Sequence, residues 1–237
     1  ANYDDRVVRR AAQNAETHRP MGIKVSQTSY SWAFSDYQNI IFFHYEFTNT
    51  GPVMTDAWVG LYTELASGNK SVYTTRNIWP PSSTGSIVGG WFSKKWLGYD
   101  DSLSLYREHY CMSQPIPDGC NLTLAPYWIG LRVLGAKGLA EDTTKRKITF
   151  QAWNWDPNSA ARDQDVERYQ VLSNPVSTPI AGDSLMPGTG DPVALQGIGP
   201  FPVIYKDSTI TVDFALVGGL TIEEIQENSR TAQRAFN

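Results

Sequence analysis

Cysteine and histidine are scarce in this chain of 237 residues, which contains two cysteines and three histidines. The histidines, His18, His44 and His109, form no HxH, HExxH or HxxE pattern, so the sequence gives no sign of a zinc hydrolase. His44 alternates with apolar neighbours and is interpreted as a surface or cross-strand residue. A Gly-x-Ser-x-Gly motif is also missing, and the glycines at 85–90 lack the GK[ST] ending of a phosphate-binding loop.

Long apolar runs and blocks of one charge are absent as well. No stretch of about 18 consecutive apolar residues is present, so the sequence predicts no membrane-spanning helix. The formal net charge is −4, and the basic residues are not clustered as they are in proteins that bind nucleic acid or anionic membranes. The chain starts at Ala1 without a signal-peptide pattern, which we interpret as a processed or excised form.

The two cysteines, Cys111 and Cys120, enclose a segment with two prolines and a glycine, which predicts a bent loop. A CxxC motif is missing, and His109 is the only histidine nearby, so redox and metal chemistry are the weaker alternatives. Free thiols are a further alternative. The spacing favours a structural disulfide, which would indicate an oxidising compartment.

Alternating apolar and polar residues predict a mainly β protein. Five segments show the period of two that is typical of half-buried strands: 41–47, 57–63, 127–134, 147–153 and 208–217. Segments 22–30 and 201–205 are weaker candidates, and a turn at Lys206-Asp207 would pair the second of them with 208–217 as a hairpin. The sequence predicts one domain over 1–237, an antiparallel β-sandwich that is Ig-like or jelly-roll-like.

A C-terminal helix over 221–236 is predicted by its capping pattern. Thr221 and Glu224 stand at the two positions of a capping box, and the acidic residues precede the basic ones as the helix dipole favours. A narrow apolar stripe predicts that this helix packs on a sheet. The segments 72–99 and 157–199 are predicted to be long loops, which in a compact protein are commonly functional or involved in contacts.

Acidic residues in these loops are candidate metal ligands. Calcium binds six to eight oxygen atoms, and loop carboxylates supply them. The sequence predicts no organic cofactor, and calcium if a metal is bound; its candidate ligands are Asp100, Asp101, Asp156, Asp163 and Asp165. The alternative interpretation is that these residues stabilise turns. A glycosidase carboxylate pair stays open, because the separation of its carboxylates is a spatial quantity.

Eight tryptophans are a high number for this length. Trp58, Trp128 and Trp153 fall in predicted strands and are expected to fill the sandwich. The others of interest fall in or beside the first long loop and form a candidate contact surface: Trp79, Trp91 and Trp96. Exposed aromatic side chains suit either protein interfaces or the faces of sugar rings.

Several segments together resemble a poorly characterised group of large secreted bacterial proteins that often end in a type IX secretion sorting domain. The matching segments are Pro20 to Trp32, Ile40 to Thr50, Val59 to Tyr62, Gly98 to Asp101, Tyr127 to Leu134, Glu167 to Ser173 and Ser208 to Phe236. The resemblance implies export and a cell-surface or extracellular setting, but it implies no activity. No sorting domain follows Asn237, so we expect a fragment or a mature product.

The function that these observations favour is a non-catalytic extracellular or cell-surface module for structure or adhesion. Partner proteins or copies of the same chain are the expected partners. A carbohydrate-binding module is the alternative, and a carboxylate-dependent glycoside hydrolase is a weaker one. Neither nucleic acid nor a transmembrane segment is predicted.

We predict that Cys111 and Cys120 form a disulfide. Intact mass after alkylation, with and without reductant, should show no alkylated thiol in the unreduced protein and two after reduction. Two alkylated thiols before reduction would show that the bridge is absent and would remove the local argument for an oxidising compartment.

Overall fold

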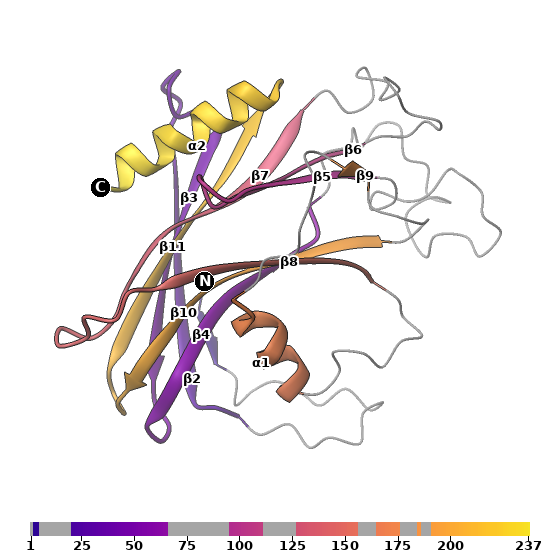
Figure 1. Ribbon diagram of the computed structural model, residues 1–237. Helices are drawn as coiled ribbons and strands as arrows, with labels where there is room; N and C mark the ends of the chain where they lie inside the picture. The colour runs from indigo at the N-terminus through magenta and orange to yellow at the C-terminus, as the bar shows by residue number, and fades with distance from the viewer. Residues whose placement is uncertain are drawn as a thin grey trace.

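The computed structural model describes residues 2–4, 20–65, 95–110, 127–155, 165–175, 184–185 and 191–237. In these ranges eleven strands and two helices form two packed antiparallel sheets, with a helix on each outer face (Figure 1). The predicted mainly β sandwich with a C-terminal helix is therefore confirmed. Neither of the described helices has the length and apolar content needed to cross a bilayer.

The larger sheet has eight strands, all paired antiparallel. In spatial order they are β1 (Asn2–Asp4), β2 (Ile23–Ser31), β3 (Ile40–Asn49), β11 (Thr209–Gly219), β7 (Trp128–Lys137), β6 (Leu105–Tyr110), β5 (Lys95–Asp100) and β9 (Ser184–Leu185). The smaller sheet contains β4 (Met54–Thr63), β10 (Asp191–Ile204) and β8 (Lys147–Trp155), with β10 in the centre.

The core between the sheets is made by the alternation that the sequence predicts. Phe150 of β8, Phe201 of β10 and Phe214 of β11 are almost completely buried in one cluster that draws residues from both sheets. Leu131 and Val133 of β7 join this cluster, as their alternation predicts. Burial of this apolar surface supplies the main driving force that holds the two sheets together.

Asn49 joins the two sheets at a corner of the sandwich. Its side chain is fully buried, and its Nδ2 donates to the carbonyls of Pro52 (2.7 Å) and Ile204 (2.9 Å). The backbone amide of Asp207 donates to the Asn49 carbonyl at 2.6 Å. These bonds fix the connections β3–β4 and β10–β11, both of which pass from one sheet to the other.

The hairpin expected between 201–205 and 208–217 is therefore wrong. β10 pairs with β4 and β8, whereas β11 pairs with β3 and β7 in the other sheet. Asp207 adopts a left-handed backbone (φ 65°), and this turn redirects the chain across the sandwich. Ile204 and Ile210, on either side of the turn, both enter the shared core, so burial rather than strand pairing determines the geometry of this connection.

The helix α2 (Ile222–Phe236) confirms the predicted C-terminal helix. Thr221 Oγ1 accepts from the Glu224 amide at 3.1 Å, and the Glu224 carboxylate accepts from the amide of Leu220 at 2.8 Å. Its buried face consists of Ile225, Ser229 and Ala232, packed on β11 and β7. The stripe that the sequence predicts is thus the face that docks.

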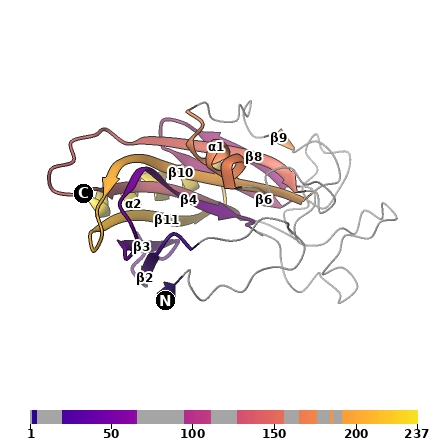
Figure 2. The same ribbon diagram turned by 90° about the horizontal axis from the view of Figure 1, so that it is seen from below.

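The predicted loop 157–199 contains regular structure. Residues Asp165–Ser173 form helix α1, and β10 begins at Asp191. Helix α1 lies over the smaller sheet, on the side away from α2 (Figure 2). The end of the other predicted loop is strand β5, which pairs with β6.

Candidate functional site

The predicted site residues divide between described and undescribed parts of the chain. The following lie outside the described residues: Cys111, Cys120, Asp156, Asp163, Trp79 and Trp91. Trp96 belongs to β5, where only its backbone position is described. The disulfide and the tryptophan contact surface therefore stay predictions.

The three described aspartates of the predicted calcium set are not brought together. Asp100 and Asp101 lie at the β5–β6 turn, whereas Asp165 begins α1 on the smaller sheet. Within the described ranges, no group of three or more His, Cys, Asp or Glu residues is arranged to hold a metal ion. Calcium binding by the full predicted set stays untested, since two of its members are not described.

Asp100 stabilises the turn that follows it by accepting hydrogen bonds. Its carboxylate accepts from Ser102 Oγ at 2.7 Å, from the Leu103 amide at 3.3 Å, and from Gln226 Nε2 of α2 at 3.0 Å. Partial burial raises the pKa of Asp100, but the hydrogen bonds from Ser102 and Leu103 outweigh it and leave the pKa below its ordinary value. The turn interpretation of this residue is confirmed.

His44 forms the cross-strand pair that its position predicts. Its Nδ1 lies 2.7 Å from Asp213 Oδ1, and the two residues stand opposite each other on β3 and β11. Both side chains lie on the outer face of the larger sheet. The pair links two central strands of that sheet.

A second polar pair lies inside the sandwich. Tyr106 and Glu108 are both fully buried, and the Tyr106 hydroxyl donates to the Glu108 carboxylate. Burial, together with the charge of Glu108, raises the pKa of Tyr106 well above its ordinary value, so the tyrosine stays a neutral donor. Because neither side chain reaches the surface, this pair belongs to the core.

Helix α1 docks on the outer face of the smaller sheet at two glycines, which have no side chain to keep the helix away. Gly60 of β4 and Gly197 of β10 both lie under Leu172 of α1, and a Cβ at Gly197 would meet Leu172 Cδ1 at 2.6 Å. A Cβ at Gly60 would also collide with that methyl group. Thr149 Oγ1 donates to the Leu172 carbonyl at 2.8 Å and satisfies an acceptor at the end of the helix.

Tyr169 holds the other side of α1 to β4. Its hydroxyl lies 2.7 Å from Asp56 Oδ2 and 3.0 Å from the Asp56 carbonyl, and it donates to these oxygens. Asp56 has a left-handed backbone (φ 54°), a conformation that aspartate tolerates better than most residues. The hydrogen bond to Asp56, with partial burial and the carboxylate charge, raises the pKa of Tyr169.

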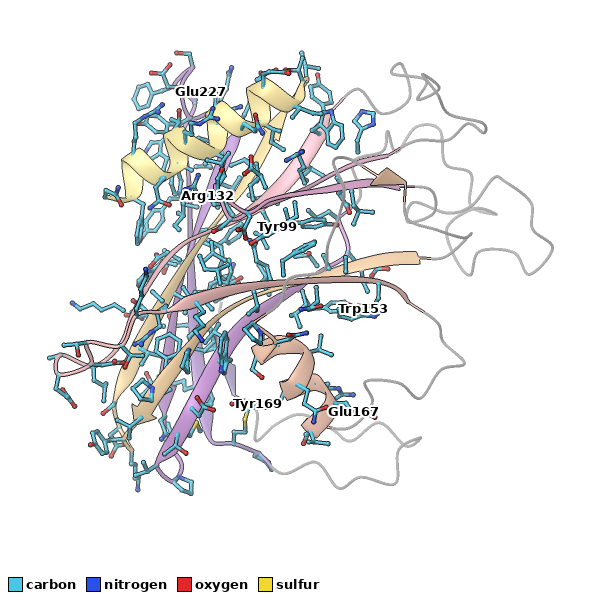
Figure 3. All side chains as sticks on the ribbon, viewed as in Figure 1. Tyr99, Arg132, Trp153, Glu167, Tyr169 and Glu227 are labelled. Carbon is cyan, nitrogen blue, oxygen red and sulfur yellow. The ribbon has the colours of Figure 1, made fainter. Side chains whose placement is uncertain are left out.

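Between α1 and the smaller sheet lies a cavity of about 740 Å³, which we call the α1 pocket. Most of its lining is apolar or aromatic, and Asp56, Asp165 and Arg168 add charge. Its lining residues are Met21, Met54, Thr55, Asp56, Ala57, Trp58, Tyr62, Trp153, Asp165, Arg168, Tyr169, Val171, Leu172 and Leu195. Figure 3 shows Trp153 and Tyr169 on the side of the smaller sheet that carries α1.

The expectation that Trp58 and Trp153 fill the sandwich is wrong. On β4 and β8 the residues that enter the core are their neighbours Ala57, Val59 and Ala152, so both tryptophans point outward into the α1 pocket. Trp58 lies flat against β10, where a Cβ at Gly199 would be 2.5 Å from its Cδ2. The rings of Trp153 and Tyr62 are 6.1 Å apart and tilted by 55°.

Trp128 likewise faces outward, on the larger sheet. It packs against the second buried cluster, which lies between that sheet and α2, and its ring is 5.0 Å from that of His109. The alternation of β4, β7 and β8 and the docking of the C-terminal helix on a sheet are both predicted from the sequence, whereas the second helix, α1, which covers the outer face of the smaller sheet, is not.

Comparison with known proteins gives little guidance. No protein-family model matches the sequence, and no curated protein matches it. Among solved structures the chain is similar to a polysaccharide lyase, with a TM-score of 0.35 and 15% identity over 90% of this chain and 22% of the lyase. The chain thus spans less than a quarter of that protein, and so distant a similarity carries no argument about function.

Replacing Tyr169 with Phe should loosen α1. The variant loses both contacts to Asp56, which we expect to cost about 0.5–1.5 kcal/mol. Folding raises the pKa of the Tyr169 hydroxyl. The stability that this hydroxyl contributes should therefore be fully present below the ordinary tyrosine pKa of about 10, and it should be lost as the pH rises through the raised pKa. Amide hydrogen exchange over 165–173 should be faster, whereas Val166→Ala, an exposed position on the same helix, should leave it nearly unchanged. Unchanged exchange in Tyr169→Phe would show that the hydroxyl does not hold the helix.

Proposed function

We propose that this chain is a non-catalytic module of a secreted or cell-surface protein that acts in adhesion or assembly. In this proposal the α1 pocket receives apolar side chains of a protein partner, which is either another protein or a second copy of the chain. The observation that carries the proposal is the apolar cavity of about 740 Å³ with an aromatic lining. The resemblance to exported bacterial proteins supports the setting.

The pocket is accessible from the surface. Met21 is 64% exposed, Tyr62 50% and Tyr169 42%, although all three line the cavity. Connected apolar surface of this kind commonly marks an interaction site. Aromatic side chains that are already held in place make strong anchors, since little conformational freedom is lost on binding.

The composition of the pocket favours apolar side chains over a sugar as its occupant. A sugar brings many hydroxyl groups, and each needs a hydrogen-bond partner when it is buried. Most of the lining of the α1 pocket is apolar or aromatic, and the Asp56 carboxylate already accepts from Tyr169. Two methionines, Met21 and Met54, add adaptable apolar surface that suits protein side chains.

A hydrolase is the less favoured function for this pocket. The carboxylates of the α1 pocket are Asp56 and Asp165. A glycosidase needs one carboxyl group of its catalytic pair to be shielded from water, so that it stays protonated and acts as the acid. The Asp165 side chain is 73% exposed, with Arg168 at 3.8 Å, and Asp56 is engaged by Tyr169. These surroundings are those of surface charges rather than of a catalytic acid.

The proposal predicts that peptides with aromatic or aliphatic residues bind at the α1 pocket. Peptides selected from a random library against the wild-type chain should bind at least about tenfold more weakly to Trp153→Ala and Tyr62→Ala, as expected for central anchors. Tyr127→Ala is the matched control, because Tyr127 is 56% exposed and lies on the α2 side of the molecule.

Two further measurements complete this test. Sedimentation velocity over a range of concentrations should show whether a second copy is the partner, in which case the same two variants should weaken self-association. Selected peptides that bind all variants equally, or a neutral glycan that competes for the pocket, would contradict the proposal.

A further inference from the structure

The connection between β2 and β3 lies on the other outer face of the molecule, beside α2 (Figure 1). Aromatic rings from this connection and from the two strands form a cluster there. Tyr30 of β2 stands opposite Phe42 of β3, so their side chains lie on the same face of the sheet, and Trp32 follows directly after the end of β2. Phe42 packs in the cluster beneath α2. This site is therefore separate from the α1 pocket and does not depend on the function proposed for it.

Trp32 is fixed by its neighbours but stays accessible. Its ring lies 5.4 Å from that of Phe42, edge to face, and 6.0 Å from that of Tyr37. The ring of Tyr30 is nearly parallel to it, at 6.2 Å and 11°. Trp32 is nevertheless 44% exposed and Tyr30 48%. Two parallel, half-exposed rings are thus held in place before any ligand arrives.

The segment that carries these rings is polar but almost uncharged. From Thr28 to Asn39 the one charged residue is Asp36, and its carboxylate accepts from Ser35 Oγ at 3.2 Å. The exposed hydroxyl and amide side chains available beside the rings are those of Thr28, on the same face of β2 as Tyr30, and of Ser35, Gln38 and Asn39 in the connection. Such groups donate and accept hydrogen bonds without requiring a charged partner.

We propose that this surface, which we call the Trp32 platform, binds a neutral oligosaccharide. The indole of Trp32 and the phenol of Tyr30 would stack against the apolar faces of sugar rings, while the serine, glutamine and asparagine side chains bond to sugar hydroxyls. The near absence of charge disfavours acidic polysaccharides and nucleic acids, which need basic groups. The segment is also small for a protein interface, to which each side contributes roughly 20–30 residues.

Isothermal titration with neutral hexasaccharides tests this inference. The probes are the gluco-, xylo- and manno-hexaoses, with a hexamer of galacturonic acid as the charged comparator. At least one neutral probe should bind the wild-type chain, Trp32→Ala and Tyr30→Ala should each bind it about tenfold more weakly, and Trp32→Phe should bind within a few-fold of wild type. Because Trp32 also covers Phe42, the exposed Tyr30 and the conservative Trp32→Phe keep the test valid if Trp32→Ala unfolds.

Tyr62→Ala in the α1 pocket is the matched control and should leave sugar binding unchanged. The inference is overturned if no neutral hexasaccharide binds, if only the charged hexamer binds, or if folded Trp32→Ala and Tyr30→Ala bind as well as wild type. If Tyr62→Ala alone abolishes sugar binding, the sugar site is the α1 pocket; both this inference and the protein-partner proposal then fail, whereas the preceding outcomes leave the latter intact.

Discussion

Helix α1 and Trp58 pack on the outer face of β10 at Gly197 and Gly199, where the strand has no side chains. The packing of both depends on these two glycines. Leu172 of α1 fills the space above Gly197, and Trp58 lies flat above Gly199. Any larger residue at Gly197 would meet Leu172 and the Thr149 hydroxyl at less than 3 Å. The glycines therefore determine how closely α1 approaches the sheet, and the remaining space between helix and sheet is the α1 pocket.

On the outer face of the larger sheet, glycines also lie under the helix α2, but there the helix completely covers the strands that lie beneath it. Gly130 and Gly219 lie under Ile225 of α2, and Gly135 lies under Phe236. Because α2 is a longer helix with a continuous buried stripe, it seals the strands beneath it. Helix α1 has nine residues, none of them buried, so it covers its sheet only in part. One helix thus completes a core, whereas the other leaves an aromatic surface accessible to a ligand.

Strands and the C-terminal helix were predictable because each has a clean period and local signals. Residues 209–214 alternate between polar and apolar side chains, and Thr221 with Glu224 marks the start of α2. Only the end of strand β10, within segment 201–205, was predicted as a weak strand, because the glycines and prolines from Gly197 to Pro202 are typical of a loop. Helix α1 was missed because its apolar periodicity is weak, and it is held by Leu172 and Tyr169 rather than by a buried stripe. The α1 pocket, built from these two elements, was missed with them, and its tryptophans were consequently assigned to the core.

The most direct test of this account is amide hydrogen exchange in Gly197→Ala, with Gly218→Ala as the matched control. At Gly218 an added Cβ would have its nearest neighbour at 3.8 Å, which is ordinary contact. The account predicts that Gly197→Ala increases exchange over 165–173 by about tenfold or more while β11 stays protected, and that Gly218→Ala changes neither. If amide protection of α1 were unchanged in Gly197→Ala, the account would be contradicted, because the docking of the helix would then not depend on the absence of a side chain at Gly197.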